Sequence, residues 1–494
     1  MTARLLLLLI VWLNAQAGFC ISIVEQNLVR RQSSGGISSS SLQVLQENGF
    51  TGQVLTSSMA GFSNFTQAWA MNYNESPQLA LVPLTSNDVS VAVKWANSFD
   101  YDFAVRSGGA AASQSPMVII ALSLLNTVDY IPSEGVIHLG PGNVWGDVYD
   151  AMADLDVTAL GGRLPLIGVG GFTAGGGISY LLNHYGLASD SVIDAEVVLA
   201  NGSIVWASSN ANLLYAVRGA GFTIGAITEY VVKAYPKPTE IYSGFVLFNM
   251  DNFDEISAFV ANTTATNTDP NVALLMGVVL SQGVQTILIF PIVYGDEAFA
   301  KQSLPWIWEL PDPLLDSTTN VTWETLQNLQ LDFVSHPLPT DDYQQHSIVV
   351  RSLTTSVIQA AVDWQTPLLS DPRWAGLQIL IEPFIPNSFS SHFTTGPWPH
   401  SYPTMHVIQL FIQEADAAPA DSLENFNQLV TGAGLVEAAA GTGNVLQRYP
   451  NYYLQGTPAD QFYGPNLPQL QVVKREFDPN NRFNKGIAIV NSTS

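Results

Sequence analysis

Hydrophobic residues recur along the chain with two periods, and these periods predict helices and strands. Apolar side chains at Val89, Val93 and Ala96 fall on one face of a helix, which we place over residues 88–97 after a strand at residues 81–84. Short apolar runs bounded by polar or glycine residues predict further strands in the first half of the chain. These runs cover residues 103–105, 118–122, 136–139, 195–199 and 204–207.

The pattern changes at about Pro236, where longer strands begin to alternate with helical stretches. The apolar runs that predict these strands cover residues 244–247, 273–280, 285–293, 377–381 and 405–412. This order favours a large antiparallel sheet covered by helices, so the fold class is predicted to be α+β. Trp and Pro gather at residues 305–313 and 397–403, which indicates long loops over that sheet.

Glycine is concentrated in three loops of the first half. The first loop is Arg106-Ser107-Gly108-Gly109, the second covers residues 169–190, and the third covers residues 212–229. Glycine tolerates positive φ and lets the backbone approach a ligand closely, and successive N–H groups in such a turn can hold a diphosphate. Each loop alone is more readily explained as a tight turn than as a ligand site, but the three in this order favour a ligand site.

The net charge of the chain limits the classes of molecule that it can bind. Its 494 residues carry 17 Lys and Arg against 41 Asp and Glu, a net charge of −24. A surface so acidic repels phosphate backbones and anionic lipids, so we expect neither nucleic acid nor a membrane as a partner. The single cysteine, Cys20, excludes a disulfide within the chain, and the seven histidines show no i, i+4 spacing, so no metal site is expected.

The N-terminus has the pattern of a secretory signal peptide. A basic start at Arg4, an apolar run over residues 5–13 and Ala15-Gln16-Ala17 predict that residues 1–20 are removed. Residues 21–45 then form a polar leader, in which Arg30-Arg31 is either a processing site or part of an ordinary linker. A secreted or secretory-pathway location also agrees with six N-glycosylation sequons, at Asn64, Asn74, Asn201, Asn262, Asn320 and Asn491.

The loops and the C-terminal segment together resemble a known family. They are similar to the FAD-linked oxidoreductases of the vanillyl-alcohol-oxidase type, in the berberine-bridge-enzyme-like branch. The three loops match that family's motifs in order, and residues 463–466 with Lys474 and residues 477–483 resemble its closing segment. The domains implied by the resemblance are a two-subdomain PCMH-type FAD-binding domain over residues 46–236, a substrate-binding domain with a large antiparallel sheet over residues 237–445, and a C-terminal segment, residues 446–494, that returns to the FAD domain.

Two positions depart from the family pattern. The histidine that bonds covalently to the flavin in relatives is Ala110 here, and the cysteine that forms a second bond in some members is Leu164. Neither side chain can form such a bond, so we expect FAD to be bound noncovalently. A covalent link commonly raises the flavin potential, so its loss implies a weaker oxidant.

The resemblance also implies cofactor contacts residue by residue. The pyrophosphate would be bound by N–H groups of Arg106, Ser107, Gly108 and Gly109. The ribityl chain and ring would lie against the backbone of Gly170, Gly171, Gly175, Gly176 and Gly177. The adenine would be flanked by Val197, Val198 and Ile204, and the isoalloxazine would be faced by Ile227 and Thr228.

The substrate half carries the implied catalytic groups. Residues 406–410 resemble the strand that bears the branch's glutamine, here Gln409, and residues 449–452 match its Y-x-N-Y element. A tyrosine of this element, Tyr449 or Tyr452, would act as base beside Gln409 while hydride passes to flavin N5. The alternative is that these side chains only pack the sheet and its loops. Further acid/base candidates are Glu382 and His400.

These features predict an FAD-dependent oxidase or dehydrogenase that acts on a small apolar metabolite. O2 is the expected electron acceptor, and the expected role is a tailoring step in natural-product biosynthesis. The tryptophans expected to line an apolar pocket are Trp306, Trp308, Trp364, Trp374 and Trp398. The loss of both attachment residues leaves a second hypothesis open, a redox-inactive flavin-fold protein that binds or cyclises its ligand.

Overall fold

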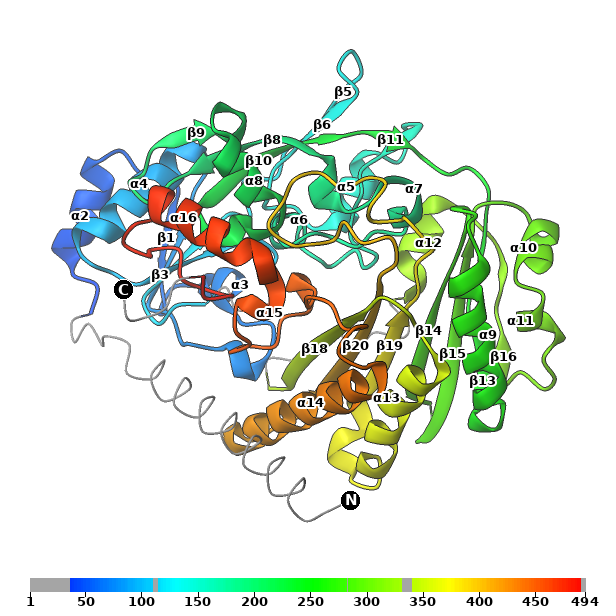
Figure 1. The fold of residues 1–494 in the computed structure, drawn as a ribbon. Helices are drawn as coiled ribbons and strands as arrows, with labels where there is room; N and C mark the ends of the chain where they lie inside the picture. Colours follow the sequence, from blue (N-terminus) through cyan, green and yellow to red (C-terminus); the bar gives the residue numbers. More distant parts are fainter. Residues whose placement is uncertain (1–35, 110–113, 282, 331–339, 490–494) are drawn as a thin grey trace.

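The first glycine loop follows a small, mostly parallel sheet. The computed structural model describes residues 36–109, 114–281, 283–330 and 340–489 (Figure 1). The strands of this sheet are β1 (Gln53–Thr56), β2 (Leu79–Val82), β4 (Val118–Ala121) and β3 (Phe103–Arg106), in that order. β2, β4 and β3 run parallel, and β1 pairs antiparallel with β2. Parallel strands need a crossover connection, and α4 (Ser86–Ser98) supplies it between β2 and β3 while α2 (Ser39–Glu47) packs beside it.

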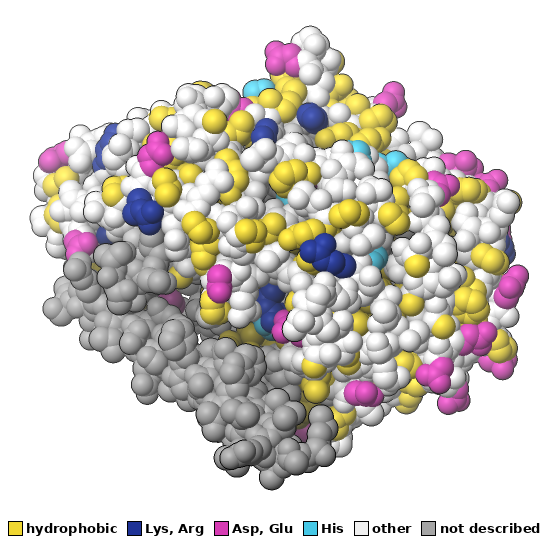
Figure 2. All heavy atoms as spheres, in the orientation of Figure 1, with side chains coloured by type: hydrophobic (Ala, Val, Ile, Leu, Met, Phe, Trp, Pro, Cys, Tyr) yellow, Lys and Arg dark blue, Asp and Glu magenta, His cyan; other side chains and the backbone are white. Residues whose placement is uncertain are grey.

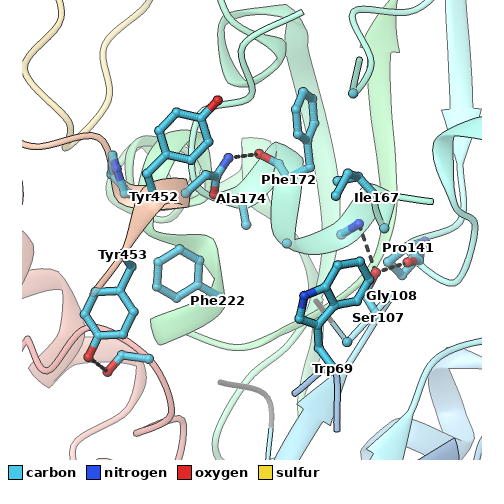
Figure 3. Close-up of a pocket in the computed structure, with 18 of the residues that line it drawn as sticks. Trp69, Ser107, Gly108, Pro141, Ile167, Phe172, Ala174, Phe222, Tyr452 and Tyr453 are labelled. Atoms are coloured by element: carbon cyan, nitrogen blue, oxygen red, sulfur yellow. Dashed lines mark hydrogen bonds between the residues drawn. The ribbon is translucent and has the colours of Figure 1, made fainter. Parts of the chain in front are cut away.

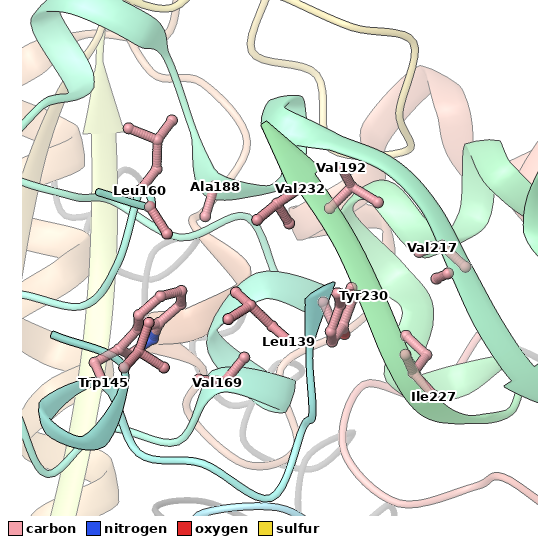
Figure 4. Close-up of a cluster of buried hydrophobic side chains, with 14 of the residues drawn as sticks. Leu139, Trp145, Leu160, Val169, Ala188, Val192, Val217, Ile227, Tyr230 and Val232 are labelled. Carbon is pink, nitrogen blue, oxygen red and sulfur yellow. The ribbon is translucent and has the colours of Figure 1, made fainter. Parts of the chain in front are cut away.

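A second sheet is antiparallel and carries the other two glycine loops. Its strands, in order, are β5 (Val128–Ile131), β6 (Val136–Leu139), β10 (Ala226–Lys233), β8 (Val192–Val198) and β9 (Ile204–Trp206). α5 (Trp145–Ala151), α6 (Val169–Ala174) and α8 (Ala211–Ala220) lie around it. Figure 4 shows how Leu139, Trp145 and Tyr230 pack together in its core, beside Val169 at the start of α6. The short glycine-rich helix α6 is therefore stabilised by the packing of its few large apolar side chains and not by a large number of helical turns.

The second half of the chain forms a large antiparallel sheet. Its path is β16 (Leu315–Asp316), β13 (Val246–Asn249), β15 (Val284–Val293), β14 (Val272–Ser281), β19 (Gln378–Glu382), β20 (His406–Glu414) and β18 (Asp342–Val350). β12 (Ile241–Ser243) pairs with both β15 and β17 (Thr319–Val321) at one end. Three helices cover one face, α9 (Phe253–Thr266), α13 (Thr355–Leu368) and α14 (Pro419–Ala440).

The two faces of this sheet have different surroundings, because side chains alternate between them along each strand. Successive strand residues point to opposite faces. Ile408 and Leu410 of β20 and Ile381 of β19 belong to the apolar core under the helices. Gln409 of β20 and Leu380 of β19, which are cross-strand partners, therefore face the other way, toward the two smaller sheets. This face is the one that carries the candidate site.

The C-terminal segment returns to the first half of the chain. In Figure 1, α15 (Asp460–Tyr463) and α16 (Leu467–Phe477) lie against the glycine-loop half, at the red end of the colour bar. The buried Lys474 ammonium donates to the Thr223 carbonyl and to Asp478 Oδ2, both at 2.6 Å, and to the Phe483 carbonyl at 2.8 Å. One buried charge thus holds the C-terminal segment to the third glycine loop.

The structure confirms the α+β prediction but differs from the expected elements at several points. The strand expected at residues 244–247 begins only at Val246, as β13, and a separate strand, β12, ends just before Gly244, whose φ of +149° would strain any other residue. A short helix, α11 (Trp306–Glu309), lies where a loop was expected. β18 was not predicted at all, because its first half is polar. The predicted signal peptide and most of the leader lie outside the described residues.

The surface agrees with the acidic composition. Figure 2 shows acidic side chains spread over the visible face, with fewer Lys and Arg between them. Within the described ranges, no helix is both long and apolar enough to cross a bilayer. The sequon residues Asn64, Asn74, Asn201, Asn262 and Asn320 are exposed, and Asn491 lies outside the described residues.

Candidate active site

A cavity of about 370 Å³ lies between the glycine loops and the open face of the large sheet (Figure 3). Ser107, Gly108 and Gly170 line it on the loop side, while Leu380 and Gln409 line it on the sheet side. The C-terminal segment closes it further with residues 449–453 and 485–487. All three parts of the chain therefore contribute to one site.

Hydrogen bonds and a close backbone contact hold the first two glycine loops together at the cavity wall. The Ser107 hydroxyl donates to the Pro141 carbonyl and accepts from the Gly170 N–H at 3.1 Å. A Cβ added to Gly108 would lie 2.6 Å from the Gly168 Cα, so both positions require glycine. The N–H groups of Gly108 and Gly109 have no acceptor among the described residues. Free N–H groups in a glycine turn at a cavity suit the diphosphate of a dinucleotide.

The remaining residues implied for the cofactor divide into two groups. Ile227, like Gly170 and Gly171, lines the cavity, and nothing lies within 4 Å of a Cβ added to Gly171. The Arg106 side chain turns instead to the Gln67 carbonyl, to which it donates at 2.6 Å. The other four residues lie outside the cavity lining. Val197 and Val198 are buried, and Ile204 is exposed. The Thr228 hydroxyl donates to the Glu196 carboxylate at 2.7 Å.

Gly175, Gly176 and Gly177 meet the C-terminal segment rather than the cavity. A Cβ on Gly175 would lie 1.9 Å from Asn451 Oδ1. The positive φ values of Gly176 and Gly177, +123° and +88°, turn the backbone so that two N–H groups point at one oxygen. That oxygen is the Tyr449 hydroxyl, which accepts from the N–H groups of Gly177 and Ile178 at 2.9 and 3.0 Å.

Tyr449 is surrounded by donors. Besides the two backbone N–H groups, the Asn451 side-chain amide donates to its oxygen at 3.0 Å. Burial raises the pKa of Tyr449 well above its usual value, although these three hydrogen bonds act in the opposite direction. A neutral phenol oxygen has two lone pairs, so three neighbouring N–H groups leave none for a proton from a ligand. Tyr449 is therefore built into the wall as an acceptor.

Tyr452 has the opposite arrangement. Its hydroxyl donates to Glu382 Oε1 at 2.6 Å and accepts from the Arg163 guanidinium at 3.0 Å. Arg163 also donates to the same Glu382 oxygen. Burial and the Glu382 carboxylate raise the pKa of Tyr452, while Arg163 opposes them. Burial disfavours the charge on Arg163, but Glu382 more than offsets this and raises its pKa. Arg163 and Tyr452 line the cavity, and Glu382 is fully buried behind them.

Gln409 makes a different contact from the one predicted. Its Nε2 donates to Gln345 Oε1 at 2.7 Å, and Gln345 Nε2 donates to the Asn451 carbonyl at 3.1 Å. The hydrogen bond that Gln409 donates within the described structure therefore goes to a second glutamine and not to a tyrosine. Gln345 comes from β18, the strand that the sequence pattern did not reveal.

Two other sets of residues that were expected at the site lie outside the cavity lining. His400 is buried between the Trp398 carbonyl, 2.7 Å from Nδ1, and the Asp190 carboxylate, 3.1 Å from Nε2, and it is not among the lining residues. The expected pocket tryptophans pack elsewhere; Trp69 is the tryptophan that lines the cavity within the described chain. Those that belong to or pack against the apolar cores are Trp306, Trp308, Trp364, Trp374 and Trp398.

Sequence reasoning did not assign Arg163 or Gln345 to the site. Arg163 directly precedes Leu164, whose position was identified, so its neighbourhood was a usable hint. Gln345 offered no comparable motif. In the part of the chain that the structure describes, no group of three or more His, Cys, Asp or Glu could hold a metal ion.

The comparison with known families agrees with this geometry. Residues 77–208 match the family model described as FAD binding domain, and residues 449–489 match the one described as berberine and berberine like. The chain thus contains one segment similar to the FAD binding domain family and a C-terminal segment similar to the berberine and berberine like family. The two matched segments meet at Gly175–Gly177 and Tyr449.

Named relatives match part of the chain. FAD-dependent monooxygenase drtC of Aspergillus calidoustus is 33% identical over 207 residues, 40% of this chain and 39% of that protein. The chain thus spans about two fifths of the length of that relative. Among solved structures, 6-hydroxy-D-nicotine oxidase from Arthrobacter nicotinovorans has a TM-score of 0.76 at 21% identity, over 90% of this chain and 98% of that one. Xylooligosaccharide oxidase from Myceliophthora thermophila, in complex with xylobiose, has a TM-score of 0.80 at 19% identity, over 92% and 100%. The structural likeness shows the fold.

Proposed function

We propose that this chain oxidises a small, largely apolar metabolite by removing a hydride and a proton. FAD, when bound, would supply the hydride acceptor at its N5 atom. The observation that carries the proposal is the Tyr452 hydroxyl, which lies at the cavity with a carboxylate as its proton acceptor. The glycine loops support it, since the free N–H groups of Gly108 and Gly109 fit the diphosphate of FAD.

Tyr452 is the better candidate for the base. A proton leaving the substrate would move to the Tyr452 oxygen as the phenol's own proton moves to Glu382 Oε1. Arg163 donates to both oxygens, so its positive charge faces whichever of the two groups carries the negative charge. Tyr449 lacks such a route because its oxygen is already occupied by three N–H donors.

Phenylalanine variants of the two tyrosines test the proposal. A panel of aryl alcohols and cyclic amines is first screened for reduction of the bound flavin, followed at its visible absorbance without oxygen. With a reducing compound, Tyr452→Phe should slow reduction by about 10²-fold or more, the usual share of a general base. Tyr449→Phe should weaken FAD binding instead, with the rate of the loaded fraction within about tenfold. Wild-type reduction by Tyr452→Phe would remove Tyr452 from the base role.

The biological setting is also part of the proposal. Fungal FAD-dependent monooxygenases are among the relatives, which supports a tailoring role in natural-product biosynthesis, with O2 as electron acceptor. The exposed sequons support passage through the secretory pathway, which a mass loss after glycosidase treatment of the native protein would test.

The second candidate is a redox-inactive protein that binds or cyclises its ligand. It is favoured by the absence of both attachment residues, since Leu164 lines the cavity where a relative has cysteine, and Ala110 lies outside the described residues. The colour of the purified protein separates the two. Yellow protein whose flavin is bleached by a substrate supports the oxidoreductase, while protein that binds no flavin supports the alternative.

A further inference from the structure

Two glutamines at the cavity form a directed chain of hydrogen bonds. Gln409 Nε2 donates to Gln345 Oε1, and Gln345 Nε2 donates to the backbone carbonyl of Asn451. The carbonyl at the end of the chain can only accept, so the Gln345 atom that faces it must be nitrogen. Gln345 therefore turns its oxygen toward Gln409, and Gln409 must turn its nitrogen toward Gln345. The backbone of Asn451 thus fixes the orientation of both side-chain amides.

One acceptor is left over by this arrangement. Gln409 Oε1 has no donor among the described residues, and Gln409 lines the cavity while only 6% of its surface is exposed. This oxygen is open to the cavity, so a ligand or water there can donate to it. The chain of amides therefore presents a fixed acceptor to whatever occupies the cavity.

The surrounding charged side chains indicate that the substrate beside the cofactor is neutral. The two charged side chains among the described lining residues are Arg163 and Lys485, and each is already paired. Arg163 pairs with Glu382, and Lys485 donates to Asp102 at 2.8 Å. The cavity offers no unpaired charge to a carboxylate or an ammonium group, so its polar recognition depends on hydrogen bonds.

We infer that Gln409, oriented by Gln345, selects neutral ligands that carry an O–H or N–H donor. This inference rests on the proposed function, because it takes the cavity as the substrate site. Gln409 and Glu382 lie on the same sheet face as diagonal neighbours, which are typically about 7–8 Å apart. An O–H group donates to one acceptor at a time, so the group held by Gln409 differs from the one deprotonated at Tyr452. The substrate class is thus a neutral molecule with two separate donor groups.

A matched pair of probes tests the inference without turnover. 2-Naphthol carries an O–H donor, whereas 2-methoxynaphthalene has the same ring system without a donor. Both are titrated into FAD-loaded oxidised protein, and binding is followed by quenching of tryptophan fluorescence, since Trp69 lines the cavity. The wild type should bind 2-naphthol about tenfold more tightly than the ether, the ratio expected when a buried acceptor is otherwise left unsatisfied.

Variants of the two glutamines test whether the hydrogen-bonded amides cause this preference for 2-naphthol over the ether. Gln409→Met should reduce it to about one, and Gln345→Met should reduce it as well, because a released Gln409 amide can turn its nitrogen to the ether oxygen. Gln330→Met, which removes a lining amide outside the chain, should keep the tenfold ratio. Equal binding of both probes by the wild type would overturn the inference, as would a tenfold ratio in Gln409→Met. A retained preference in a protein whose flavin no substrate reduces would instead contradict the proposed function alone.

Discussion

The Tyr452 hydroxyl donates to Glu382 across 2.6 Å, although the two residues lie 70 positions apart. Glu382→Gln keeps the shape of the side chain but removes its capacity to take a proton. We expect flavin reduction to slow by about tenfold or more, because the Tyr452 proton loses its acceptor. The pH profile of reduction should also change shape, which a purely structural role would not cause.

A second buried carboxylate on a neighbouring strand provides the control. Glu414 ends β20, is buried, and bonds to the Asn425 amide at 2.8 Å outside the cavity lining. Glu414→Gln should leave the reduction rate and its pH profile near those of the wild type. Equal slowing in the two variants would show that Glu382 acts through general stability and not through Tyr452.

Removing the buried ammonium of Lys474 should destabilise the protein. Lys474→Met leaves the Asp478 carboxylate buried with an unpaired charge and leaves two carbonyl groups without their donor. A loss of one partner from a buried ion pair costs about 3–5 kcal/mol, which urea unfolding would measure. Lys301→Met, which breaks the exposed Lys301–Glu297 pair, should leave the urea midpoint close to that of the wild type. Similar midpoints for both variants would contradict the assigned role of Lys474.

Acid should destabilise the fold partly through His406. Burial lowers the pKa of His406 from 6.5 to about 4, and its Nδ1 accepts from the Phe384 N–H. The unfolded chain binds a proton here below about pH 6.5, and the folded chain does not until about pH 4. Stability from this group is therefore present above pH 6.5 and falls by up to about 3 kcal/mol as the pH drops to 4.

The His406→Gln variant isolates that contribution. Glutamine keeps an acceptor for the Phe384 N–H but does not titrate. Urea midpoints measured between pH 7 and pH 4 should fall less steeply for the variant than for the wild type. Parallel pH curves for the two proteins would show that His406 does not contribute to acid sensitivity.

FAD should be released from the denatured protein. Leu164 lines the cavity and offers no thiol, and Ala110, outside the described residues, offers no imidazole. Flavin fluorescence should therefore leave the protein band on denaturing electrophoresis and appear in the acid supernatant. The double variant Ala110→His with Leu164→Cys is the matched comparison, in which some flavin should stay with the band. Fluorescence that remains with the wild-type band would contradict noncovalent binding.

Local sequence patterns were sufficient for much of the fold and for placing two glycine loops beside one cavity. Short apolar runs located β6 and β15 closely, and the glycine motifs located Ser107 and Gly170 at one cavity. These features depend on a few consecutive residues, so they can be predicted without knowing which residues pack against them.

Pairings between distant parts of the chain could not be predicted in the same way. The partner of Gln409 is Gln345, and that choice depends on which strand lies beside β20 in the folded sheet. Likewise, Arg163 meets Glu382 from 219 positions away, and His400 is occupied by Asp190 from 210 positions away. Residue type suggested His400 as an acid/base group, but only its neighbours reveal that both ring nitrogens are engaged.

The contact between Tyr449 and the turn at Gly176 and Gly177 has a consequence for biosynthesis. The Tyr449 hydroxyl binds an N–H group that lies 272 positions earlier in the chain. At a translation rate of about 5–20 residues per second, the turn leaves the ribosome on the order of tens of seconds before its partner. During that interval its N–H groups face water, and the wall behind the cofactor loops is absent. The contact that completes this wall can therefore form only after Tyr449 has been synthesised.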